Sequence, residues 1–158
     1  MSEASDQRPS RPPVTLAPEG TGRRLVQAAW VGVGLQAVAA ATAVATRSGR
    51  GPHVVVCVAL LVGGVVAATA AFLRAIDRSR TELVDVAGLF LLLGSAPRRT
   101  RTWLWGAVAA SVAVGVASAA ARPYTSLAFG VLAPLWAYGL TVLWNALHGA
   151  FPPRPRRA

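Results

Sequence analysis

Four long apolar segments without Asp, Glu, Lys or Arg constrain this chain more than any other feature. They cover residues 25–45, 53–73, 103–121 and 124–147. A helix rises about 1.5 Å per residue, so about twenty residues cross a hydrocarbon core of about 30 Å. Because lipid offers no hydrogen bonds to the backbone, even the valine-rich second segment is expected to be helical. The sequence therefore predicts an all-α, polytopic membrane protein with four transmembrane helices.

The composition supports a membrane protein over a nucleic-acid-binding protein. Hydrophobic residues make up 54% of the chain and charged residues 14%, against roughly 25% in typical soluble domains. A net charge of +10 is compatible with nucleic-acid binding. However, the basic residues, all arginine, lie between or beside the apolar segments, as in loops of membrane proteins. We therefore expect the lipid bilayer, and no nucleic acid, as the partner.

The arginines also predict an orientation. Of the sixteen, thirteen lie in the segment before the first span, the long connection after the second, and the chain after the fourth. Only Arg47, Arg50 and Arg122 lie in the two other connections. Since positive loops stay in the cytoplasm, both termini are expected there, in a multi-pass protein of the cell membrane.

The connection between spans two and three contains a shorter apolar run, residues 86–96, which is too short to cross. On a helical wheel one face is polar: Arg78, Thr81, Glu82 and Asp85. The opposite face is apolar: Leu83, Val86, Ala87 and Phe90. This pattern predicts a cytoplasmic-leaflet amphipathic helix over about 77–96 that joins two helical hairpins. Its end, 91–93, breaks the pattern and is expected to be covered by lipid or by the bundle.

The terminal segments lack the apolar residues that a folded unit needs. Residues 1–24 are polar and rich in proline, and are expected to form a disordered cytoplasmic tail. Residues 148–158 form a short basic tail with several prolines, also placed in the cytoplasm. The membrane domain is therefore predicted to cover residues 25–147.

Four residues are candidates for binding a partner or lining a pathway. Gln27 and Gln36 place carboxamides in the first span, where such groups usually join helices; a ligand pathway is the alternative. Asp85 is expected on a solvated or salt-bridged face, or else as an acid under the bundle that titrates or holds a partner. Pro134, one turn after Gly130, predicts a kink in span four, which can act as a hinge.

We predict no catalytic, cofactor-binding or metal-binding residue. His53 and His148 are expected at opposite membrane faces, so they cannot share a metal or a haem. The sequence contains no HExxH, CxxC or GxSxG pattern. The four spans also lack Asp and Glu, which argues against a small proton-coupled drug exporter.

Four stretches between residues 82 and 153 carry a resemblance to known proteins. They are Asp-Val-Ala-Gly-Leu-Phe at 85–90, Gly-Ser-Ala-Pro at 94–97, Ala-Arg-Pro-Tyr-Thr-Ser-Leu-Ala-Phe-Gly at 121–130 and His-Gly-Ala-Phe-Pro-Pro at 148–153. With these stretches the chain resembles a family of small, uncharacterised membrane proteins of high-GC Gram-positive bacteria. The resemblance implies a four-helix integral membrane protein. It implies no activity and no site residues.

The leading hypothesis is a non-enzymatic component that binds other membrane proteins or copies of itself, in a partner-binding, assembly or accessory role. Small residues at every fourth position of span three favour close helix contacts: Ala107, Ser111, Gly115 and Ala119. A small transporter or channel component, lined by the two glutamines, is the alternative. An enzyme on a lipid substrate, with Asp85 or His148 at the inner leaflet, is the third hypothesis.

Overall fold

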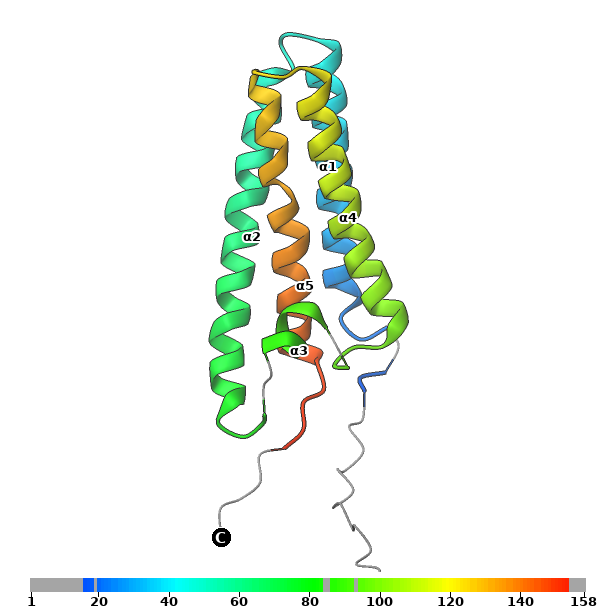
Figure 1. Cartoon of the computed structure of the whole chain (residues 1–158), viewed down its shortest axis with the longest axis vertical. Coiled ribbons are helices and arrows are strands. Elements are labelled where there is room, and N and C mark those ends of the chain that lie inside the picture. Colours follow the sequence, from blue (N-terminus) through cyan, green and yellow to red (C-terminus); the bar gives the residue numbers. More distant parts are fainter. Residues whose placement is uncertain (1–15, 19, 84–85, 93, 154–158) are drawn as a thin grey trace, which may run out of the picture.

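The structure is a computed structural model that describes residues 16–18, 20–83, 86–92 and 94–153. These residues form the helices α1 (Arg23–Ala45), α2 (Arg50–Ser79), α3 (Val86–Leu91), α4 (Arg98–Ala121), the 3-10 helix η1 (Ser126–Leu132) and α5 (Pro134–His148). Figure 1 shows α1, α2, α4 and the continuous pair η1–α5 as an elongated bundle. Each of these four is long and apolar enough to cross a membrane. The prediction of an all-helical, multi-pass membrane protein is confirmed.

The four spans alternate in direction. Helices α1 and α4 begin, and α2 and α5 end, at the end of the bundle that is lowest in Figure 1, here called the basal end. The connections over 46–49 and 122–125 lie at the opposite, distal end. The most extensive contacts join α2 to α5 and α1 to α4. Neither pair is consecutive in the sequence. The four spans therefore pack against one another as one bundle and not as two separate hairpins.

Helices α2 and α5 touch through their backbones at two glycines. A β-carbon on Gly139 would lie 2.3 Å from the carbonyl oxygen of Gly64. A β-carbon on Gly64 would lie 2.3 Å from the carbonyl oxygen of Leu135. Close approach of this kind increases dispersion contact, which drives helix association in lipid. The missing side chains thus set the distance between α2 and α5.

Trp136 fills a notch that two other glycines leave open. A β-carbon on Gly32 of α1 would lie 2.1 Å from its indole ring, and one on Gly63 of α2 would lie 2.7 Å from it. The indole Nε1 donates a hydrogen bond to the carbonyl oxygen of Ala28, at 2.9 Å. Trp136 therefore holds α5 against both α1 and α2.

The small residues expected at every fourth position of α4 pack against neighbouring helices. Ala107, Ser111 and Gly115 are buried. A β-carbon on Gly115 would lie 2.6 Å from the carbonyl oxygen of Gly130 in η1. The ladder continues with the buried Ser118, because Ala119 is only half-buried.

The predicted amphipathic helix over 77–96 is wrong in its extent. Helix α2 continues without a break to Ser79, and α3 covers only six residues. The chain then turns through left-handed backbone at Leu92 (φ 55°) and Gly94 (φ 75°). Leu92 is fully buried in the bundle, Leu91 is exposed, and Leu93 lies outside the described residues.

Arg78, expected on a polar surface face, instead joins the ends of α2 and α5. Its Nη1 donates to the carbonyl oxygen of Ala146 at 3.0 Å, and its Nη2 to that of Gly149 at 2.9 Å. Its Nε donates to Glu82 at 2.9 Å, and its guanidinium lies 5.1 Å from the ring centre of Phe151. A cation at the carbonyl end of a helix is favoured by the helix dipole. This contact explains why the polar face does not lie free on the membrane surface.

The chain after α5 packs back onto the bundle as far as Pro153, the last residue that the structure describes. The backbone amide of Ala150 donates to the carbonyl oxygen of Ser95 at 3.0 Å. The backbone amide of Leu83 donates to the carbonyl oxygen of Pro152 at 2.8 Å. The first part of the predicted tail is therefore tied down, while most of the predicted N-terminal tail, 1–15 and 19, lies outside the described residues.

Replacement of Gly139 or Gly64 by alanine should push α2 and α5 apart and destabilise the protein by about 1–3 kcal/mol, as overpacking does in cores. Gly34→Ala is the matched control, because it is also a helical glycine but has no atom within 4 Å of an added β-carbon. Thermal unfolding in detergent measures the three variants. Equal melting temperatures for Gly139→Ala and Gly34→Ala would contradict the packing described here.

Candidate functional site

Gln36 lies at the centre of a buried polar cluster that joins three elements. The side chain is fully buried. Its Nε2 donates to the carbonyl oxygens of Ser111 in α4 and Gly130 in η1, each at 3.1 Å. The hydroxyl of Ser111 donates to its Oε1. Both amide protons and the amide oxygen therefore have partners, and the expectation that Gln36 joins helices is confirmed.

Pro134 marks a change of helix type in span four. In an α-helix the carbonyl of residue 130 would accept from the amide of residue 134, but proline has no amide proton. Helix α5 begins at Pro134, and the residues before it form the 3-10 helix η1, whose bonds run from residue i to residue i+3. The expectation of one α-helix with a kink at Pro134 is therefore wrong, because the helix type changes there. Gln36 of α1 donates a further hydrogen bond to the carbonyl of Gly130.

A second polar cluster, which the sequence interpretation did not single out, centres on Asn145. Its Nδ2 donates to the carbonyl oxygens of Gly88 (2.6 Å) and Leu89 (2.8 Å), and the hydroxyl of Ser95 donates to its Oδ1 at 2.8 Å. Asn145 is fully buried. It fixes the short helix α3 to α5. In the sequence, the signal for this cluster was an asparagine at the end of an apolar span.

Gln27 and Asp85 do not join either cluster. Gln27 is exposed, close to the basal end of α1, so it does not join helices as Gln36 does. Asp85 lies outside the described residues, and both hypotheses for it stay predictions. The four candidate residues are therefore not brought together at one place: only Gln36 and Pro134 meet, through Gly130.

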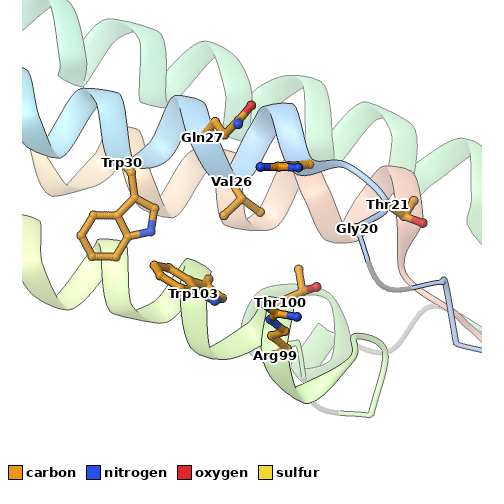
Figure 2. Close-up of a pocket in the computed structure, with 9 residues that line it drawn as sticks. Gly20, Thr21, Val26, Gln27, Trp30, Arg99, Thr100 and Trp103 are labelled. Atoms are coloured by element: carbon orange, nitrogen blue, oxygen red, sulfur yellow. The ribbon is translucent and has the colours of Figure 1, made fainter.

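Gln27 lines a hollow between the basal starts of α1 and α4, which we call the basal pocket. Its volume is about 610 Å³. It is lined by Gly20, Thr21, Arg23, Val26, Gln27, Trp30, Arg99, Thr100 and Trp103. Figure 2 shows the rings of Trp30 and Trp103 reaching toward each other from the two helices, with Arg99 and Thr100 nearer the start of α4. The two rings meet edge to face, with centroids 5.8 Å apart.

The rim of the basal pocket is held by α5. The indole Nε1 of Trp144 donates to the carbonyl oxygen of Thr21 at 3.0 Å. Gly22 has a left-handed backbone (φ 68°), and a β-carbon there would lie 2.3 Å from the same Nε1. Both the conformation and the space require glycine. The chain before α1 is thereby placed against the bundle as the pocket's edge.

The described side chains that line the basal pocket include two cations and no acid. Arg23 and Arg99 line it and are exposed. Arg24 and Arg98 are their sequence neighbours, and the described first turns of α1 and α4 contain no acidic side chain. Two helix starts, each with partial positive charge, also lie here. These groups attract an anion to the pocket.

A smaller hollow of about 370 Å³ lies beside Pro134, on the face between α2 and α4. Its walls are almost entirely apolar: Leu61, Val108, Val131, Leu132, Pro134, Leu135 and Tyr138. A lipid chain fits its chemistry, but it brings no charged side chain to one point. The basal pocket is therefore the stronger candidate site.

The two histidines lie at opposite ends of the bundle. His53 is fully buried at the distal start of α2, with its Nε2 3.6 Å from the sulfur of Cys57. His148 ends α5 at the basal end, where its ring lies 5.6 Å from that of Trp144. Within the described ranges, no three histidine, cysteine or acidic side chains gather around a point where a metal ion would fit.

Comparison with known proteins adds no further assignment: no family model matches the chain, and no curated protein or solved structure is similar to it.

Gln36→Leu should destabilise the protein by about 1–3 kcal/mol, because it removes three buried hydrogen bonds to Ser111 and Gly130. Gln27→Leu is the control: it is the same change in the same helix, at an exposed position. Unfolding in detergent, measured by circular dichroism, separates the two. A larger loss for Gln27→Leu than for Gln36→Leu would refute the role assigned to the buried cluster.

Proposed function

We propose that the protein is a non-enzymatic component of the cytoplasmic membrane, which acts by binding at its basal end. The observation that carries this proposal is that the buried and the exposed polar side chains lie in different places. Gln36 and Asn145, buried in the spans, bond to the protein itself. A group of exposed arginines lies at the basal end: Arg23, Arg24, Arg74, Arg80, Arg98 and Arg99. Such a surface is suited to an accessory or assembly role, with another membrane protein or a second copy as the partner.

The buried cluster favours binding over transport. A solute path along Gln36 would have to break the three hydrogen bonds of its amide to Ser111 and Gly130. Unpaired polar groups in a low-dielectric interior are costly. These residues therefore fit a structural role better than a pathway, and a transporter or channel component stays the second candidate.

An enzyme on a lipid substrate is the weaker alternative. His148 is half-buried and lies against the ring of Trp144. General acid–base chemistry needs a second group within hydrogen-bond reach of the reacting atoms. The only acid proposed for that role was Asp85, which lies outside the described residues.

The positive-inside rule places the basal end in the cytoplasm. A test uses Cys57→Ser to remove the single cysteine, with a new cysteine at Ser48 (distal) or Thr81 (basal), both exposed. A membrane-impermeant maleimide should label Ser48→Cys in intact cells and Thr81→Cys only after permeabilisation. The reverse pattern would place the arginine-rich end outside and contradict the orientation.

Photo-crosslinking in native membranes tests the binding role. A photoreactive residue at Arg74 or Arg80, exposed on the basal part of α2, should yield discrete adducts with a membrane protein or a second copy. The matched position is Ser48, at the distal end, which should yield none. Absence of adducts from both basal positions, with a monomeric protein in the same membranes, would remove the support for this function. Ion or solute flux through reconstituted protein that is lost in Gln36→Leu would favour the transporter instead.

A further inference from the structure

We infer that the basal pocket binds the phosphate group of an anionic phospholipid from the adjacent leaflet. This inference goes beyond the proposed function and does not depend on it, since a lipid site can exist whether or not a protein partner binds. It depends on how the charged, polar and aromatic side chains of α1 and α4 are ordered along the membrane normal.

The side chains follow the order of chemical groups in a phospholipid. Arg23 lies at the start of α1, and Trp30 lies seven residues farther along, about 10 Å deeper at the helical rise per residue. On α4, Arg99 lies near the start and Trp103 follows one turn later. Tryptophan is favoured at the level of the headgroup boundary, and arginine extends its charge toward the phosphates. The basal pocket therefore offers cations at the phosphate level and aromatic rings below them.

The lining supplies a suitable donor set for a phosphate ester. A guanidinium presents paired N–H groups that match phosphate oxygens, and Arg23 and Arg99 contribute one each from two helices. Gln27 and Thr100 add uncharged hydrogen-bonding groups beside them. Val26 forms apolar wall, and the volume of about 610 Å³ lies within the range of small-molecule sites.

The aromatic floor favours a lipid over a soluble anion. Trp30 is 36% exposed and Trp103 51% exposed, although both belong to membrane-crossing helices. Free phosphate would satisfy the arginines but leave these rings uncovered. A phospholipid places its phosphate at the arginines and its glycerol and first methylenes against the rings. Basic pockets between transmembrane helices are known to bind anionic headgroups in this way.

Native mass spectrometry of the full-length protein, titrated with phosphatidylglycerol, tests the site. The double variant Arg23→Gln/Arg99→Gln should bind about twenty-five-fold more weakly, because each arginine near an anionic lipid contributes roughly a factor of five. Arg74→Gln/Arg80→Gln is the matched control: it loses the same charge from exposed basal positions outside the basal pocket. This control should stay within about twofold of the unchanged protein, because it leaves both arginines of the pocket lining in place.

Further arms separate the possible ligands and guard against misfolding. Arg23→Gln alone should weaken binding about fivefold if the double variant does not fold. Phosphatidylcholine should bind more weakly than phosphatidylglycerol, and glycerol phosphate in excess should not displace the lipid. Equal losses in both double variants would reduce the effect to general surface charge and overturn the proposal. Displacement by glycerol phosphate would show a soluble-phosphate site instead, and equal binding of both lipids would refute selectivity for anionic headgroups.

Discussion

The structure depends on one constraint: a polar group inside hydrocarbon has to find its partner within the protein. In lipid, water is not available to satisfy an unpaired carbonyl or amide. Gln36 meets this constraint by bonding to Ser111 and to the carbonyl of Gly130. The change from 3-10 to α geometry in span four lies beside this contact from α1. One amide thus connects the first, third and fourth spans.

Two further contacts apply the same rule at the basal end. Asn145 satisfies the open carbonyls at the end of α3, and Arg78 satisfies those at the end of α5. Helix ends leave carbonyls without intrahelical partners, so these are the places where such help is needed. Around these ties, glycines allow contact at backbone distance, and Trp136 fills the space between Gly32 and Gly63. The polar contacts determine which elements meet, and the small residues determine how closely those elements pack.

This arrangement also separates the interior from the basal surface. Gln36 and Asn145 bond inside the bundle, while Arg23, Gln27 and Arg99 line a hollow at the basal end. The proposed binding role and the proposed lipid site both follow from this separation. They differ in the group they bind: the first needs a protein surface, and the second needs only the starts of α1 and α4.

The sequence by itself determined the membrane class, the four spans and the helical fold. Span length and the absence of charge are local properties, and the predicted segments agree with the observed helices to within a few residues, except that α2 and α4 extend farther at the basal end. The buried ladder on α4 was also predictable, because residues four apart share a helix face. The burial of Gln36 was expected for a carboxamide in an apolar span.

Only the tertiary structure decided what distinguishes similar residues. Gln27 and Gln36 are the same residue type in the same helix, but Gln36 meets Ser111, 75 positions away, and Gln27 lines an open pocket. Arg78, predicted on a polar surface face, instead binds the carbonyl of Ala146, 68 positions away. Periodicity in a sequence reports which side chains share a face. It does not report which distant carbonyl, hydroxyl or ring that face will meet, since the packing of the other spans places those groups.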